Sequence, residues 1–217
     1  MTQVGYAALL IGMVMAAYGV IAALLGARRQ DPRLIDSARN ATFVVGGLVS
    51  VASLALLYAL VGHDFGVKYV VNYTSRDLPL FYTVAAFWAG QDGSLLLWAW
   101  LLAGITVAVV IQNWRRNRVL LPYVIAVLLG AETFFLVILA FTSNPFARLA
   151  VPLPDGQGLN PLLQNLGMIF HPVATYLGYV GFTVPFAFAV AALVTGRLDA
   201  TWIRTTRRWT LVSWLFL

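Results

Sequence analysis

Two histidines are the residues of this sequence best suited to bind a metal, because the chain contains no cysteine. His171 stands in the run Met168–Pro172, at the start of a long apolar stretch. A neutral imidazole there could ligate haem iron or another metal at the membrane edge. The plainer alternative is an interfacial histidine that hydrogen-bonds a loop carbonyl, with Pro172 in the first turn of a helix. His63, which follows Gly62, is more simply explained as a polar residue where a helix leaves the apolar layer.

A segment rich in glycine and tryptophan, Trp88–Trp98, is the second candidate. Its glycines and serine permit helices to approach closely, and its aromatic faces could pack against a flat macrocycle. The structural alternative is an interfacial turn bordered by tryptophans of the membrane belt. Trp88 and Trp98 are therefore candidate cofactor contacts, and Asp92 between them could pair with a cation or cap the next helix.

Glu132 lies in the middle of an apolar run. Acidic side chains inside membranes are costly and often functional, so a proton relay is one interpretation. A neutral glutamic acid that is hydrogen-bonded to a neighbouring helix is the other. The motifs of common soluble enzymes are absent from the sequence: a glycine-rich phosphate loop, zinc-type histidine spacing and a serine elbow.

The composition is that of a membrane protein. Of the 217 residues, 61% are hydrophobic and 10% are charged, and the mean hydropathy is +0.84. Soluble domains carry about a quarter charged residues. We therefore predict an all-α, polytopic transmembrane bundle that forms a single membrane domain over residues 1–217. The net charge of +6 comes from arginines between apolar runs, which topology explains better than a nucleic-acid partner does.

Runs of about 20 apolar residues predict membrane-spanning helices. Five complete spans and the start of a sixth at Trp209 are expected. Four of the five follow directly from the runs Val4–Leu25, Ala41–Val61, Val119–Phe141 and Met168–Val194.

The region Leu78–Asn113 is too long for one span, since a helix of that length would rise about 50 Å. We expect it to break at the glycines of Gly90–Gly93. An outer interfacial helix would then occupy residues 79–89. The third span would be Ser94–Val110, with Ser94 as its N-cap.

The basic residues indicate the orientation. Eleven of the 14 lysines and arginines fall within residues 28–39, 115–118 and 197–208. The positive-inside rule assigns these segments to the cytoplasm. The amino terminus and two long loops, 63–78 and 143–166, would then face outward, the second loop stiffened by four prolines.

These motifs together resemble the amino-terminal portion of the CcmF family, the membrane haem lyase subunits of bacterial cytochrome c maturation. The resemblance covers essentially the whole chain in the same order. Its most specific parts are Trp88–Trp98 and Leu159–Gln164 with Ile169–Pro172 and Tyr176–Phe182; supporting parts are Asp64–Pro79, Phe141–Phe146 and Gly196–Thr201.

The resemblance implies a function in cytochrome c biogenesis at the bacterial inner membrane. Such proteins accept haem b from a periplasmic haem chaperone and promote its thioether attachment to the Cys-x-x-Cys-His motif of apocytochrome c. The chain would be one component of a holocytochrome-c synthase. His171 matches the first of two outer histidines that ligate the delivered haem iron. Arg76 or Lys68 could meet the haem propionates.

In the family, the second outer histidine, a tryptophan-rich segment and intramembrane histidines would follow Leu217. We therefore expect a larger or split protein, in which another assembly subunit or a remaining carboxy-terminal part supplies the second ligand. Two alternatives stay open: a proton- or solute-translocating subunit that uses Glu132, and a non-catalytic scaffold half.

Overall fold

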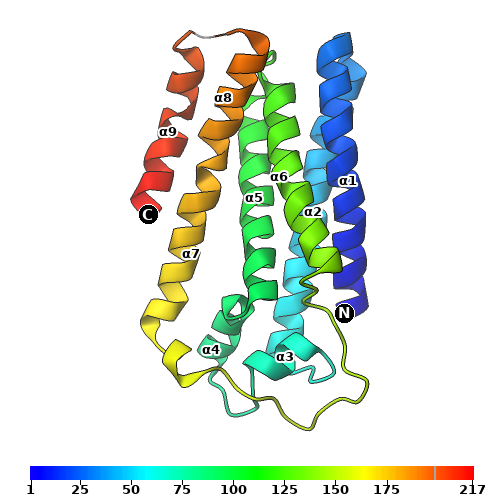
Figure 1. Cartoon of the computed structure of the whole chain (residues 1–217), viewed down its shortest axis with the longest axis vertical. Helices are drawn as coiled ribbons and strands as arrows, with labels where there is room; N and C mark the ends of the chain where they lie inside the picture. The colour runs from blue at the N-terminus through cyan, green and yellow to red at the C-terminus, as the bar shows by residue number, and fades with distance from the viewer. Residues whose placement is uncertain (198) are drawn as a thin grey trace.

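A computed structural model of the chain describes residues 1–197 and 199–217 and shows a bundle of long helices (Figure 1). Over these residues no strand forms apart from one isolated antiparallel bridge between Val67 and Arg148. The helices, in chain order, are α1 (Thr2–Arg29), α2 (Pro32–Val61), α3 (Lys68–Tyr73), α4 (Leu80–Ala85), η1 (Ala86–Trp88), α5 (Gln91–Asn113), α6 (Leu121–Phe141), η2 (Pro161–Leu163), α7 (Leu166–Gly181), α8 (Thr183–Thr195) and α9 (Thr201–Phe216).

Five of the described helical stretches are long and apolar enough to cross a membrane, and α7 with α8 forms the fifth. The expected all-α, multi-pass architecture is confirmed. In Figure 1 the amino terminus lies at the same end as α3, α4 and the loop after α6. We call this the loop end. α9 runs back from the opposite end, alongside α7 and α8.

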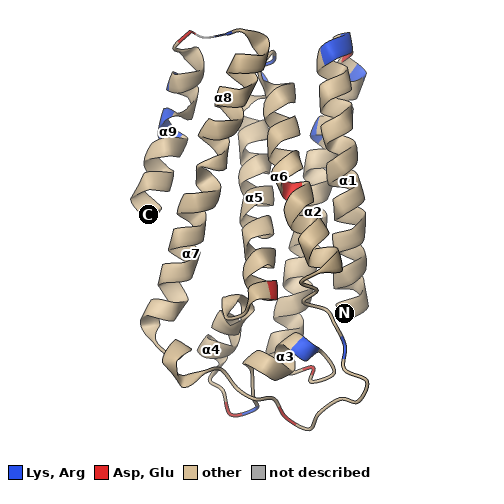
Figure 2. Ribbon diagram, in the orientation of Figure 1, with Lys and Arg blue, Asp and Glu red and all other residues tan. Residues whose placement is uncertain are grey.

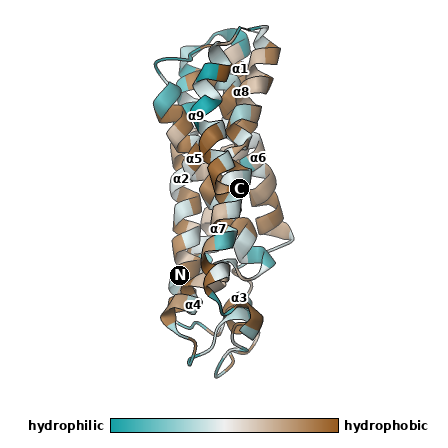
Figure 3. Cartoon of the chain, turned by 90° about the vertical axis from the view of Figure 1, so that its left-hand side faces the viewer, coloured by the Kyte–Doolittle hydropathy of each residue, from teal (hydrophilic) through white to brown (hydrophobic). Residues whose placement is uncertain are grey.

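Charge and hydropathy follow this axis. Most lysines and arginines lie in the half of the bundle opposite the loop end, around the connection of α1 with α2 and on α9 (Figure 2). This half also holds Arg115, Arg116 and Arg118 between α5 and α6, and we call it the arginine end. Hydrophobic residues cover the sides of the bundle, and hydrophilic ones concentrate at its ends (Figure 3). Large apolar side chains are exposed along the helices, among them Phe134, Phe186 and Leu193. Such an outer surface suits lipid rather than water.

Small residues bring α1 against α2 and α6. Gly5, Gly12, Gly19 and Gly26 recur every seven residues on its buried face. A Cβ at Gly19 would collide with the side chain of Leu129 in α6, so the helices approach more closely than larger residues would allow.

Several predicted helix boundaries are wrong. α2 begins at Pro32, nine residues before the expected Ala41, because Asp31 caps it by accepting the Arg33 N–H at 2.9 Å and proline suits the first helical position. α9 begins at Thr201 rather than Trp209.

The third span also starts earlier than expected. α5 begins at Gln91 with Gly90 at its N-cap position, so Ser94 is not the cap. Its hydroxyl instead donates to the carbonyl oxygen of Trp88 at 2.8 Å. The short helix expected over residues 79–89 is present as α4 and η1. Within the loop expected over residues 63–78, α3 is an additional helix.

Candidate functional site

The start of α7 is shaped by Pro172, which lies inside the helix rather than in its first turn. The side-chain oxygen of Asn165 caps the helix by accepting the Met168 N–H at 3.0 Å. Proline has no N–H to offer to the carbonyl oxygen four residues earlier, which belongs to Met168. The indole Nε1–H of Trp88 donates to that oxygen at 2.8 Å. Trp88 therefore satisfies the acceptor that Pro172 leaves open, one turn before His171.

His171 is exposed on this turn of α7. Its Nδ1 lies 3.4 Å from the Oγ1 of Thr175, one turn further along the helix. A hydroxyl that engages Nδ1 orients the ring and leaves Nε2 available to bind a metal. No group of three or more His, Cys, Asp or Glu side chains among the described residues could share a metal ion. A metal at His171 would therefore need ligands from another molecule or from a planar chelator such as haem.

Trp98 contacts α7 at a deeper level than Trp88 does. Its ring centroid lies 5.1 Å from that of Tyr176, 6.3 Å from that of Tyr179 and 5.7 Å from that of Phe135 in α6. The structure therefore brings both tryptophans to α7 but only Trp88 to the turn that carries the histidine. The two tyrosines were not predicted from the sequence as part of this aromatic group.

Tyr69 of α3 fixes the turn between η1 and α5. Its hydroxyl lies 3.0 Å from the carbonyl oxygens of Ala86 and Phe87 and accepts the Gly90 N–H at 3.0 Å. Burial raises the pKa of Tyr69 well above its usual range, so the hydroxyl remains a donor. A Cβ on Gly93 would meet this hydroxyl and the Phe87 carbonyl oxygen. Tyr69 was not predicted from the sequence, in which Gly93 is the feature that indicates close packing at this turn.

Backbone hydrogen bonds join the two loops of the loop end into one cap. In each bond one partner lies in the loop after α6, and the other belongs to α3 or follows its last residue; the loop accepts in the first bond and donates in the other two. The bonds are Lys68 N–H to Ala147 O at 2.8 Å, Gln157 N–H to Val71 O at 2.7 Å and Gly158 N–H to Thr74 O at 3.0 Å. The last two satisfy carbonyls at the end of α3 that have no partner within the helix.

Asp155 reinforces this cap. Its Oδ1 accepts the backbone N–H of Arg76 at 3.0 Å and that of Gly156 at 2.7 Å. These hydrogen bonds, the one from Arg76 first, hold the pKa of the Asp155 carboxyl below its usual range. Arg76 also donates from Nε to the Pro154 carbonyl oxygen at 3.2 Å. With Lys68 it places positive charge at the same end of the bundle as His171.

The other two candidates have no polar partner in the described part of the chain. His63 follows Gly62, the C-cap residue of α2, with a φ of 50°, and its Nε2 is buried without a hydrogen bond to a described residue. Glu132 has 0% exposure in the middle of α6, and neither of its carboxyl oxygens is hydrogen-bonded to a described residue. Asp92 lies in the first turn of α5, where a carboxylate complements the helix dipole.

Known proteins match the chain over nearly its whole length. The family model described as Cytochrome C assembly protein matches residues 88–217. Cytochrome c-type biogenesis protein CcmF of Pseudomonas aeruginosa is 44% identical over 216 residues, which cover 99% of this chain and 33% of that protein. The CcmF protein of Escherichia coli is 43% identical over 218 residues, which cover 100% of this chain and 34% of that protein.

A solved structure has the same fold. The protein titled Cytochrome c Heme Lyase CcmF superposes with a TM-score of 0.84 at 33% sequence identity, covering 99% of this chain and 34% of that one. The resemblance to CcmF that the motifs predicted is confirmed. The chain spans about a third of the length of the relatives it matches.

Proposed function

This chain belongs to the cytochrome c assembly protein family, and from that premise we propose that it handles haem during cytochrome c biogenesis. It would act as part of a membrane haem lyase, a component of a holocytochrome-c synthase. One observation carries the proposal: an exposed histidine lies on a helical turn whose open backbone acceptor is bound by Trp88. A ligand held on a stiffened turn can orient a haem, which is the requirement of this chemistry.

His171 would ligate the haem iron through Nε2 while Thr175 engages Nδ1. The one imidazole from this chain would supply one ligand to the iron. The second would come from another assembly subunit or from a remaining carboxy-terminal part. The haem would be haem b, bound transiently as the substrate.

Trp88 and Trp98 would contribute differently to this site. Trp88 borders the turn of His171 and would present an aromatic surface beside the macrocycle. Trp98 would support α7 from below through its contacts with Tyr176 and Tyr179. Lys68 or Arg76 would pair with the haem propionates.

The reaction itself needs no atom from this chain. The S–H group of each cysteine of apocytochrome c adds across a vinyl C=C bond, so that sulfur bonds to one carbon and hydrogen to the other. The residues described here would orient the haem and exclude unproductive poses.

The partners would be a periplasmic haem chaperone that delivers haem and the apocytochrome that receives it. We place the chain in the bacterial inner membrane with its amino terminus and loop end outside, as the arginines at the opposite end favour.

Replacing His171 with Ala in the native gene tests this proposal. We expect the yield of haem-stained c-type cytochromes to fall about tenfold or more, because an iron ligand is lost. The amount of the protein in the membrane should stay unchanged, since the side chain is exposed.

His63→Ala provides the comparison, because it removes the other histidine at the same end of the bundle. Its cytochrome yield should stay near that of the wild type. Normal yield in the His171 variant would refute the ligand assignment. Equal losses in both variants would show that the effect is not specific to His171.

A further inference from the structure

A cavity of about 670 Å³ opens at the arginine end, far from His171. Four arginines line it: Arg39 from α2, Arg115 and Arg116 after α5, and Arg208 from α9. In the described part of the chain the one ion pair is Arg39–Asp36, at 3.6 Å. Three of the four positive charges in the cavity therefore have no carboxylate within ion-pair distance, and all three side chains are exposed. Such a cavity attracts an anion.

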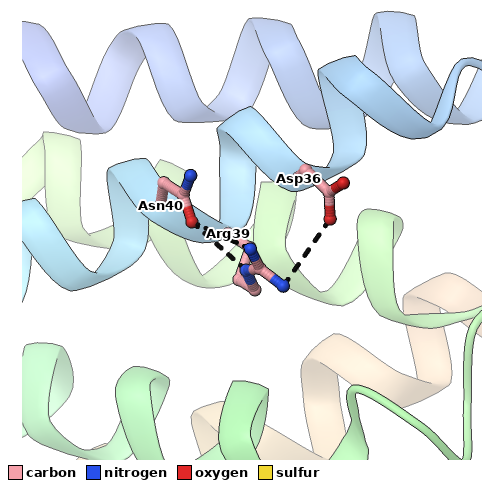
Figure 4. Close-up of polar contacts among 3 residues, drawn as sticks. All are labelled: Asp36, Arg39 and Asn40. Carbon is pink, nitrogen blue, oxygen red and sulfur yellow. Dashed lines mark hydrogen bonds and ion pairs between the residues drawn. The ribbon is translucent and has the colours of Figure 1, made fainter.

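Arg39 is held in place at this cavity by its neighbours. The Nε and Nη2 atoms of Arg39 each donate a hydrogen bond to the Oδ1 of Asn40 at 3.2 Å. Its Nη1 forms an ion pair with Asp36, and these side chains lie on the face of α2 that points away from α1 (Figure 4). Its Cζ lies 4.4 Å above the ring centroid of Trp114 at the end of α5. A guanidinium stacked on tryptophan is typical of the headgroup depth of a membrane.

An apolar groove between α2 and α5 continues from this cavity. Phe43 lines both, and the groove, of about 280 Å³, extends past Gly47 and Gly104 to Ser50. Ser50 accepts the indole N–H of Trp100 at 3.0 Å.

Gly47 and Gly104 leave this groove open because neither has a side chain to fill it. A Cβ on Gly47 or Gly104 would have no neighbouring atom within 4 Å. By contrast, a Cβ on Gly46 would come 2.9 Å from Val107, so that glycine permits the contact between α2 and α5. From Arg39 to Ser50 the helix rises about 16 Å, roughly half of the hydrocarbon thickness. That is the depth of one lipid leaflet.

We propose that the cavity and groove bind one anionic phospholipid. The phosphate would lie among Arg39, Arg115, Arg116 and Arg208, and an acyl chain would run over Phe43 and Gly47 toward Ser50. A free anion would use the arginines but has no use for the apolar groove, which favours a lipid as the occupant. Because Arg208 belongs to α9, the bound headgroup would also join α9 to α2 and α5. This site is independent of the proposed haem function.

Thermal unfolding and native mass spectrometry of the purified protein test the proposal without any variant. The protein is placed in nanodiscs of phosphatidylcholine with or without phosphatidylglycerol, and inorganic phosphate is added separately. We expect phosphatidylglycerol to raise the melting temperature and to remain bound to the protein. Equal effects of the two lipids would overturn the proposal. An equal effect of phosphate alone would also overturn it, since the site would then hold a bare anion.

Two variants locate the lipid. Arg115→Gln with Arg116→Gln should weaken phosphatidylglycerol retention about tenfold, and Gly104→Leu should reduce it by filling the groove. Arg29→Gln with Arg33→Gln removes the same charge at the same end, outside the cavity, and Gly130→Leu adds a side chain at another open glycine. These comparison variants should retain the lipid. If they lose it to the same extent as the cavity variants, the lipid is not bound where we propose.

Discussion

At the scale of single residues, the turn that carries His171 depends on a donor from another helix. Pro172 removes one backbone hydrogen bond from α7, and the Trp88 indole replaces it at 2.8 Å. The two residues should therefore be energetically coupled, because each determines what the other contributes.

A double-mutant cycle checks this coupling. Trp88→Phe should lower the free energy of unfolding in mixed micelles by about 1–3 kcal/mol, because the Met168 carbonyl loses its donor. In a Pro172→Ala background the new backbone N–H reaches the same oxygen, so the cost of Trp88→Phe should be smaller. Strictly additive costs would mean that the indole hydrogen bond is not what stabilises this turn.

Asp155 gives the cap of the loop end a defined response to pH. Its pKa is lower in the folded protein than its usual value of about 3.9, so the ionised form stabilises the cap above that pH. This contribution is lost as the pH falls through the folded pKa. The protection of the Gln157 and Gly158 amides against hydrogen exchange, relative to their intrinsic rates, should therefore be high at neutral pH and fall in acid.

Asp155→Asn supplies the comparison for this pH response. These amides should already exchange faster in the variant at neutral pH and respond less to acid. An unchanged acid response in the variant would assign the effect to another group.

At the scale of elements, the angle between η1 and α5 is set by Tyr69 and the absence of a side chain at Gly93. Gly93→Ala should lower the free energy of unfolding by about 1–3 kcal/mol, since a backbone carbonyl cannot move aside easily. Gly130→Ala in α6, where a Cβ meets nothing within 4 Å, should be neutral or stabilising by up to about 1 kcal/mol. Similar melting temperatures for the two variants would contradict this account.

The sequence predicted the elements well where one physical requirement dominates. Apolar length alone defined four of the five spans, because a bilayer demands about 20 such residues, and the third also needed the glycine break at Gly90–Gly93. The start of α2 was missed because Arg33 and Arg39 interrupt the apolar pattern, although Asp31-Pro32 is a good initiation signal. α3 was missed because six residues are too few for a periodic pattern, and backbone bonds from the distant loop stabilise its end.

The candidate site was only partly predictable. His171 was a candidate because the sequence has only two histidines and no cysteine, and the segment after Trp88 was a candidate because of its glycines. The bond from Trp88 to Met168 could not be inferred, since it joins residues 80 positions apart through packing of α5 and α7. The assignment of His171, Trp88 and Trp98 to haem stays a prediction.

At the scale of the whole molecule, the two ends of the bundle differ in charge and in architecture. The arginine end has short connections, whereas the loop end carries α3, α4 and the hydrogen-bonded cap (Figures 1 and 2). The positive-inside rule predicts that the loop end faces outward.

Labelling of introduced cysteines checks this orientation, and the absence of native cysteine gives a clean background. Leu162→Cys, at a side chain that is 82% exposed in the loop end, should react with an impermeant maleimide in intact spheroplasts. Arg29→Cys, at the arginine end, should react only after the membrane is permeabilised. The reverse pattern would overturn the predicted topology.

The bond between Trp88 and Met168 also has a consequence for the order of synthesis. Its donor precedes α5 and its acceptor lies in α7, so the bond cannot form until three successive spans have been inserted and packed. During translation the His171 turn therefore remains one hydrogen bond short until α7 docks against the earlier helices. A nascent chain would then present the His171 side chain in a defined pose only after the bundle around it is assembled.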